Sequence, residues 1–374
     1  MQTLILRASR FLLNCSAAAA IVTVAYSPAT AAYIQENLVS DIPGLATFTD
    51  PDLVNPWGIA RSGGSPWWVS NNGTAKATLY DGGGVKRALV VTIPGANSAP
   101  TGTVFNNTSS FLVGGPGTTA RFIFANENGS IEAWNTGANA VIKATTPGGS
   151  YKGIAIGTNA SGDFLFATNF ASGKVDVFNG SFGAASVPGN FNDPNLPAGY
   201  APFGIQNING KIYVAYAFKL PGADDETAGP GLGIVNVFDT NGNLLGRVAT
   251  GGTLNAPWGL TLAPKNFGPF SGDLLVGNFG DGTINAFDPL TDAFEGQLKK
   301  TGGVLSIDGL WGLGFGNGGS AGPFNALYFA AGINDEGDGL FGRIRVPEPA
   351  TLPLFGIGLL GLFALRRRKE AKAK

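Results

Sequence analysis

The sequence predicts an all-β protein, a propeller of six blades, and three observations lead to this prediction. The chain of 374 residues is rich in turn formers, with 58 glycines and 23 prolines, and only 13% of its residues are charged. One short motif recurs six times, and runs of strand-forming residues follow each recurrence. Helical periodicity is almost absent between the two termini. Short strands joined by tight turns, in repeats of about 50 residues, are typical of propeller blades.

Residues 1–32 are predicted to be a secretory signal peptide. Arg7 and Arg10 form a positive start, residues 11–25 are mostly apolar, and residues 29–32 offer a small-residue cleavage site. Cys15 lies inside the apolar stretch, which leaves a lipoprotein signal as an alternative, although Leu13-Asn14 is a poor context for lipid attachment. A buried N-terminal helix is a second alternative.

The six-fold motif predicts the innermost strand of each blade. Its glycines, spaced 44 to 55 residues apart, are Gly58, Gly102, Gly153, Gly204, Gly259 and Gly312. Innermost strands crowd around a central channel, so a residue without Cβ lets neighbouring backbones approach there. Trp57, Trp258 and Trp311 each precede one of these glycines. We expect these rings to pack between adjacent blades, with stacking on sugar rings as the alternative.

The two ends of the propeller are predicted to complete one another. Residues 37–44 repeat the pattern of residues 88–95, the outer strand of the first unit, with Leu, Val, Ile, Pro and Gly in the same register. The last unit stops at residues 343–346, one strand short. We therefore expect residues 34–42 to supply the outer strand of the sixth blade and to close the ring, because closure removes exposed sheet edges.

The C-terminus carries three features in order. Pro347, Glu348 and Pro349 precede an apolar run at residues 351–365, which predicts a short transmembrane helix, and the cluster Arg366, Arg367 and Arg368 follows it. Residues 347–369 resemble a PEP-CTERM sorting signal, and residues 370–374 form a basic tail. The resemblance implies processing by an exosortase and delivery to the envelope of a Gram-negative bacterium that produces exopolysaccharide. A plain short membrane anchor is the alternative.

The propeller itself, residues 33–346, has an acidic charge balance. It holds 16 Lys and Arg against 23 Asp and Glu, a net charge of −7, which argues against nucleic acid as a partner. The chain contains no histidine, and Cys15 is its single cysteine. The absence of histidine excludes histidine-dependent catalysis. Cleavage of the predicted signal peptide would remove Cys15, and with it the one thiol nucleophile.

Three segments of the propeller resemble an uncharacterised bacterial family of PEP-CTERM-associated propellers with NHL-type repeats. They are residues 201–207, 277–282 and 332–336. The resemblance extends over nearly all of residues 33–346 and implies a fold and a location, but no activity and no functional residues.

Two sets of polar residues are candidate sites. Acidic insertions in the fourth and sixth units are candidate Ca²⁺ ligands, because Ca²⁺ takes six to eight oxygens in flexible geometry; solvated acidic loops are the alternative. They comprise Asp224, Asp225, Glu226, Asp335, Glu336 and Asp338. Asparagines that follow the second strand of four units either shape turns or line a ligand face. They are Asn71, Asn126, Asn169 and Asn278.

No catalytic constellation is recognisable, so we expect a binding protein rather than an enzyme. The leading interpretation is a rigid surface or matrix module associated with exopolysaccharide. The alternative is a Ca²⁺-dependent lactonase or hydrolase, as in six-bladed propellers that hold Ca²⁺ in the channel. Its candidate ligands are the four asparagines together with Glu127 and Asp335. A purely structural surface protein is the third interpretation.

Overall fold

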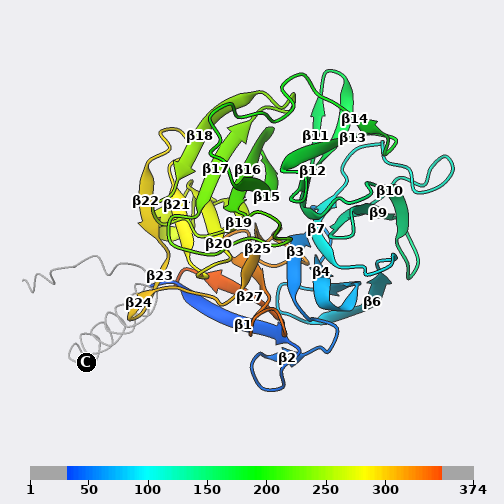
Figure 1. Cartoon of the computed structure of the whole chain (residues 1–374). Coiled ribbons are helices and arrows are strands. Elements are labelled where there is room, and N and C mark those ends of the chain that lie inside the picture. Colours follow the sequence, from blue (N-terminus) through cyan, green and yellow to red (C-terminus); the bar gives the residue numbers. More distant parts are fainter. Residues whose placement is uncertain (1–31, 348–374) are drawn as a thin grey trace, which may run out of the picture. The chain divides into compact units, whose positions relative to one another are not determined.

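The computed structural model describes residues 32–347 and arranges them as six antiparallel sheets around a central channel (Figure 1). The predicted signal peptide, the predicted transmembrane helix and most of the sorting signal lie outside the described residues. Within residues 32–347, no helix is long and apolar enough to span a membrane. The only helical turns in this part of the chain are the 3-10 segments η1 (Asn72–Thr74) and η2 (Gly268–Phe270).

Each of the first three blades has four strands, which follow one another in chain order from the channel outward. The first contains β3 (Pro56–Ala60), β4 (Trp67–Asn71), β5 (Lys76–Tyr80) and β6 (Lys86–Thr92). The second contains β7 (Pro100–Phe105), β8 (Phe122–Asn126), β9 (Ser130–Trp134) and β10 (Val141–Thr145), also from the channel outward. The third contains β11 (Tyr151–Asn159), β12 (Gly162–Asn169), β13 (Lys174–Asn179) and β14 (Ala184–Ala185).

The remaining blades repeat this plan. The fourth contains β15 (Tyr200–Ile208), β16 (Lys211–Phe218), β17 (Gly233–Phe238) and β18 (Leu244–Thr250). The fifth contains β19 (Pro257–Leu262), β20 (Leu274–Asn278), β21 (Ile284–Phe287) and β22 (Phe294–Gln297). A small hairpin, β23 (Lys299–Lys300) and β24 (Gly303–Val304), follows it. The sixth contains β25 (Leu310–Phe315), β26 (Leu327–Ala331), β27 (Leu340–Arg345) and β1 (Ile34–Ser40).

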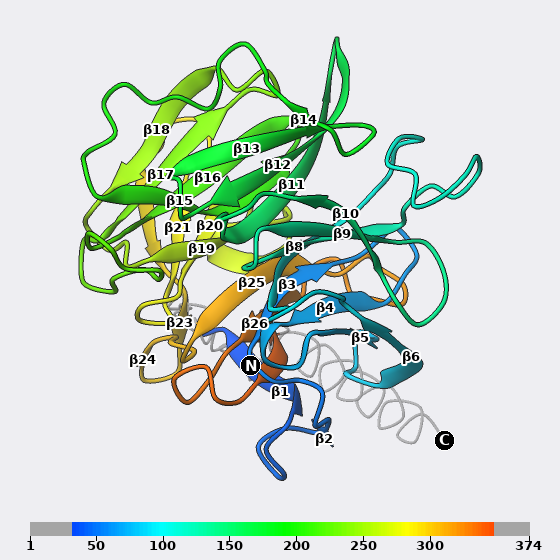
Figure 2. The same cartoon turned by 45° about the vertical axis from the view of Figure 1, so that its right-hand side comes forward.

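The N-terminal strand closes the ring, as predicted. β1 pairs antiparallel with β27, from Ile34 opposite Arg345 to Ser40 opposite Leu340. The strand ends two residues before the predicted boundary, because the chain turns at residues 41–44. A short parallel strand, β2 (Phe48–Thr49), then pairs with the end of β1 in a loop that projects from the disc (Figure 2).

The repeat glycines lie where adjacent innermost strands meet, as predicted. A Cβ placed on Gly204 would come within 2.0 Å of the Trp258 carbonyl oxygen, and one on Gly312 within 2.5 Å of the Trp57 oxygen. The pairing register shifts around the glycine in every innermost strand, which is the signature of a β-bulge. A bulge re-aims the neighbouring side chain, so the residue before each glycine turns toward the channel.

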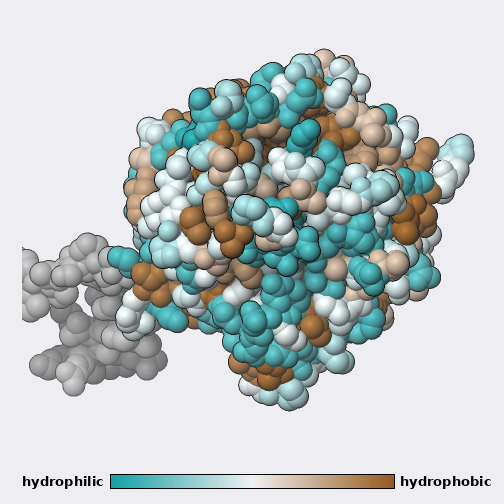
Figure 3. All heavy atoms as spheres, viewed as in Figure 1, coloured by the Kyte–Doolittle hydropathy of each residue, from teal (hydrophilic) through white to brown (hydrophobic). Residues whose placement is uncertain are grey.

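Apolar side chains fill the spaces between blades and form the core. One such cluster joins Trp68, Phe122 and Trp134 from the first two blades, with the Trp68 and Phe122 rings 4.2 Å apart. Apolar side chains that remain exposed are scattered among polar ones on the face of the protein drawn in Figure 3. Because these clusters recur between neighbouring blades, the channel walls are held rigidly on all sides.

Among residues 32–347, one carboxyl group in the core has no counter-ion. Glu132 in β9 is fully buried; its Oε1 accepts a hydrogen bond from the Ser130 hydroxyl, and its Oε2 has no partner. Burial raises the pKa of Glu132 to about 8, from an ordinary value of 4.5. Its proton is therefore retained in the folded protein at pH 7 and lost in the unfolded chain.

This shift predicts a loss of stability at high pH. A group whose pKa rises on folding contributes stability that is complete below pH 4.5 and is lost as the pH rises through about 8. We expect Glu132→Gln, which cannot ionise, to gain stability over the wild type by a few kcal/mol as the pH rises from 4 to 9. Urea unfolding across this range measures the difference, with the exposed Glu295→Gln as control; a difference independent of pH contradicts the prediction.

Candidate functional site

One end of the central channel is closed by aromatic rings. The innermost strands all begin at this end, which we call the start face, and finish at the opposite end, the end face. Trp57, Trp258 and Trp311 meet here across the channel: Trp57 and Trp311 stack with centroids 3.5 Å apart, and Trp258 lies edge-on to both. Phe203 and Phe279 complete this aromatic plug. The predicted contacts between adjacent blades form, since Trp57 and Trp311 come from the neighbouring first and sixth blades and Trp258 from the fifth. They form inside the channel, where Trp57 also contacts Trp258 and Phe203 on the opposite side, because the bulges turn these rings inward.

A buried lysine completes the plug from the third blade. Lys152 occupies the motif position that holds Trp or Phe in four other blades, and its side chain is only 1% exposed. Its Nζ lies 5.3 Å from the Trp57 ring and 5.8 Å from the Phe170 ring, within range of a cation–π attraction. The same ammonium forms ion pairs with Glu127 and with Asp225, whose Oδ1 is 2.7 Å away. These carboxylates raise the pKa of Lys152 against the opposing effect of burial, which keeps the side chain charged.

Two further carboxyl groups lie beside this ion pair. Burial raises the pKa of Glu226 to about 7, although the Lys152 ammonium opposes the shift. Burial also raises the pKa of Glu336, whose Oε2 accepts a hydrogen bond from the Asn55 amide at 2.6 Å. The start face therefore gathers carboxylates from the second, fourth and sixth blades around the buried ammonium of Lys152.

The predicted calcium ligands are only partly brought together. Asp225, Glu226 and Glu336 meet near Lys152, whereas Asp224 and Asp335 are exposed and Asp338 bonds the amide of Asn334. No group of three or more acidic side chains between residues 32 and 347 is arranged to hold a metal ion. Lys152 supplies a positive charge among these carboxylates from within the chain, and the calcium hypothesis stays a prediction.

The four asparagines do not line an open surface, which corrects the ligand-face prediction. All are at most 2% exposed, and their amides bond the loops that precede the innermost strands or nearby turns. Asn126 accepts from the Ala99 amide, Asn169 from that of Ser150 and Asn278 from that of Asn255. Asn71 donates to Thr78 within the first blade. The repeated asparagine is therefore turn chemistry, its alternative interpretation.

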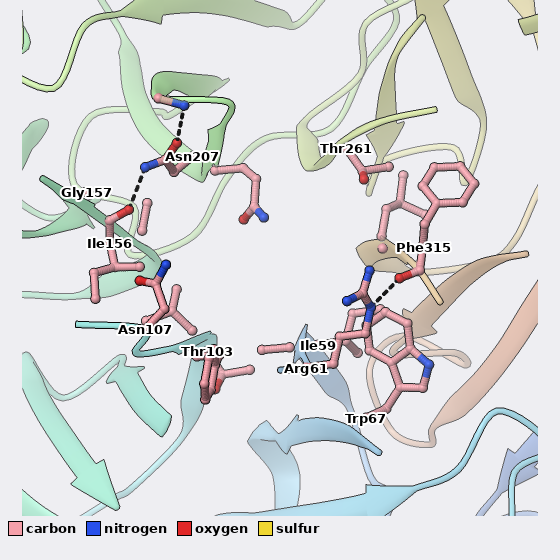
Figure 4. A pocket seen from close by; sticks show the side chains of 18 of the residues that line it. Ile59, Arg61, Trp67, Thr103, Asn107, Ile156, Gly157, Asn207, Thr261 and Phe315 are labelled. Carbon is pink, nitrogen blue, oxygen red and sulfur yellow. Dashed lines mark hydrogen bonds between the residues drawn. The ribbon is translucent and has the colours of Figure 1, made fainter. Parts of the chain in front are cut away.

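The end face holds a different site, an open cavity of about 640 Å³ (Figure 4). The ends of all six innermost strands contribute to its wall. Its lining includes Ile59, Arg61, Thr103, Phe105, Ile156, Thr158, Gln206, Asn207, Thr261 and Phe315. Toward the plug the channel narrows to a space of about 30 Å³. Two other hollows, of about 720 and 650 Å³, lie between blades on the outside. We take the channel cavity as the candidate site because side chains of every blade converge on it.

Hydrogen bonds within the chain hold the polar wall of this cavity in place. Asn207 donates from its amide to the Ile156 carbonyl at 2.8 Å and accepts from the Gly210 amide at 3.0 Å (Figure 4). Thr103 is nearly buried and its hydroxyl has no hydrogen-bond partner among the described residues. Asn207 is thus held in one orientation at the cavity wall, whereas the Thr103 hydroxyl is enclosed by the protein.

Sequence reasoning missed Lys152 at the start face and the whole cavity at the end face. Lys152 carried a detectable signal, since it is a charged residue at a motif position otherwise filled by aromatic residues or Thr101. The cavity residues carried none, because they lie at strand ends with no recurring residue type. Only the closure of the ring brings them together.

Comparison with known proteins gives one matching family model and several relatives. Residues 345–369 match the PEP-CTERM protein-sorting motif, which implies an exported protein that an exosortase processes and a membrane anchors beforehand. The chain is 34% identical over 325 residues to uncharacterized protein R648 of Acanthamoeba polyphaga mimivirus, covering 82% of this chain and 78% of that protein. Uncharacterized protein L690 of the same virus is 33% identical, covering 82% and 84%.

Solved structures share the fold at low sequence identity. A structural genomics protein of unknown function from Bacteroides thetaiotaomicron has a TM-score of 0.53 at 11% identity, over 84% of this chain and 73% of that one. A PQQ-bound aldose sugar dehydrogenase from Streptomyces coelicolor has a TM-score of 0.52 at 14% identity, over 85% and 99%. These likenesses establish the propeller fold and nothing about activity.

Proposed function

The chain belongs to the protein family that includes uncharacterized protein R648 of Acanthamoeba polyphaga mimivirus, and we propose that it acts as an exported, non-catalytic binding propeller. In this proposal the ligand is exopolysaccharide, held at the end-face cavity. The sorting motif implies export and exosortase processing. We further place the processed protein at the outer surface or in the extracellular matrix of a Gram-negative bacterium, after transient anchoring in the inner membrane.

The chemistry of the cavity wall is the observation that supports this proposal. Amide and hydroxyl side chains of Asn107, Gln206, Asn207 and Thr261 line a space of about 640 Å³, within the usual range for a small-ligand site. Trp67, Phe105 and Phe315 lie among the same lining residues. Neutral hydrogen-bonding groups beside aromatic rings suit a ligand with many hydroxyls and apolar ring faces. The closed ring keeps these groups preorganised, which lowers the entropic cost of binding.

Binding to native exopolysaccharide tests the proposal. We expect purified residues 33–346 to sediment with the polysaccharide and to give hits on a glycan array. The double variant Asn107→Ala/Gln206→Ala should bind at least tenfold more weakly, at about 1 kcal/mol for each lost hydrogen bond. Lys300→Ala, in the outer hairpin away from the channel, is the matched control. Failure of the wild-type protein to bind any glycan would leave the purely structural interpretation.

A metal-dependent hydrolase is the alternative, and one observation favours it. Glu226 on the start face has a pKa of about 7, which suits a general acid or base at neutral pH. Turnover of a lactone or ester that requires Ca²⁺ and is lost in Glu226→Gln, with Asp224→Asn as control, would replace the binding proposal. Absence of turnover for every lactone and ester tested, with and without Ca²⁺, would contradict this alternative.

A further inference from the structure

Among the described residues that line the end-face cavity, Arg61 is the single charged one. The other lining residues are apolar or carry neutral amide and hydroxyl groups. The propeller as a whole has an excess of acidic residues, 23 against 16 basic ones between residues 33 and 346. A lone cation in the mouth of an acidic propeller creates a local field that favours an anion.

Two blades hold the guanidinium in a fixed orientation. Arg61 Nε donates to the carbonyl of Phe315, at the end of β25, and the guanidinium carbon lies 5.7 Å from the centre of the Trp67 ring. Trp67 is itself fixed, since its Nε1 donates to the Ala321 carbonyl at 2.9 Å. With Nε engaged at the wall, the terminal nitrogens of Arg61 point into the cavity (Figure 4). The fork that matches a carboxylate is therefore preorganised.

Residues 32–347 supply no counter-ion for this side chain. None of the ion pairs formed between residues 32 and 347 includes Arg61. Asp163, behind Thr158 at the rim, is engaged by the hydroxyls of Thr158 and Ser110, at 2.6 and 2.7 Å. Partial burial also lowers the pKa of Arg61, which is the effect of withdrawing a cation from water without a partner. A partly buried charge without a counter-ion is stabilised by an anionic ligand.

We propose that the end-face cavity binds a sugar residue that carries a carboxylate, a uronic acid, with the carboxylate on the Arg61 guanidinium. The sugar hydroxyls then meet the side-chain amide of Gln206, and the ring packs beside Phe315. This inference rests on the proposed carbohydrate-binding function and adds its ligand class. It implies that acidic exopolysaccharides are bound in preference to neutral ones.

Calorimetry with matched oligosaccharides tests the inference. A tetramer of glucuronic acid and a tetramer of glucose, with the same linkage, are titrated into residues 33–346 at low salt. We expect the acidic tetramer to bind at least about tenfold more tightly, the usual effect of a charge-assisted bidentate contact. In Arg61→Gln this preference should fall to within about threefold, while affinity for the neutral tetramer barely changes. Arg121→Gln, which removes an exposed charge outside the cavity, should keep the full preference.

The outcomes separate this inference from the proposed function. Equal binding of the two tetramers by the wild type overturns the acidic preference and leaves carbohydrate binding intact. An unchanged preference in folded Arg61→Gln overturns the role of Arg61. Absence of binding to both tetramers and to native polysaccharide overturns the proposed function as well. If Arg61→Gln does not fold, Arg61→Lys, which keeps the charge but loses the planar fork, should show an intermediate preference.

Discussion

Removal of residues 33–44 should leave a chain that does not accumulate as soluble, folded protein. The deletion strips β1 from the sixth blade and leaves the backbone groups of β27 unpaired along its outer edge. It also removes Leu38 and Val39, both nearly fully buried, from the core beside the first blade. A propeller opened in this way exposes apolar surface and a free sheet edge, which together promote aggregation. Expression yield, circular dichroism and thermal melting measure the outcome.

A charge variant in the same strand serves as the control for this deletion. Glu36 pairs with Arg343 and Arg345 across the β1–β27 contact, and all three side chains are partly exposed. Glu36→Gln removes both ion pairs and keeps the strand, so we expect it to cost no more than about 1 kcal/mol. A soluble deletion protein with a cooperative melt near that of the wild type would show that the ring does not depend on β1.

The second large effect concerns the ion pairs beneath the start face. Lys152 is fully buried, whereas its partner side chains Glu127 and Asp225 are 27% and 74% exposed. Loss of the two carboxylates leaves the buried Lys152 ammonium without its ion-pair partners. Loss of the lysine leaves two carboxylates that water can still solvate. We therefore expect Glu127→Gln/Asp225→Asn to destabilise the protein by about 3–5 kcal/mol, and Lys152→Met by clearly less.

The test is whether Glu127→Gln/Asp225→Asn lowers the free energy of unfolding more than Lys152→Met does. Methionine can pack against the Trp57 and Phe170 rings that lie near the Lys152 ammonium. The triple variant, with all three changes, should recover most of the stability lost in the carboxylate double variant. Urea unfolding at pH 7 measures all three proteins, and a Lys152→Met variant less stable than the double variant would contradict this account. The exposed pair of Arg87 and Asp81 supplies a control, since Arg87→Met should change stability by less than about 1 kcal/mol.

Much of the scaffold was predictable because the blade is a local unit. The glycine of each motif and the alternating strands after it depend on neighbouring residues, and every such unit became a blade. The shared pattern of residues 37–44 and 88–95 even predicted a contact between opposite ends of the propeller. The repeated asparagines were also local, and their turn interpretation is the one that the hydrogen bonds support.

The orientation of the motif tryptophans was not predictable in the same way. Strand alternation places Trp57 and Trp311 between blades, but a bulge at each glycine turns them into the channel, where they stack on one another. A bulge depends on how two strands pair, and the linear pattern of side chains does not reveal it.

By itself the sequence determined the number of blades, the strand that closes the ring and the sorting motif at the C-terminus. Each of these features depends on residues close together in the chain or on a repeated pattern. Only the tertiary structure decided what the channel contains. Lys152 and its carboxylate partners come from different blades, as do Arg61, Phe315 and Thr103 at the opposite mouth. Their proximity results from the curvature of the closed ring, and no spacing along the chain encodes it.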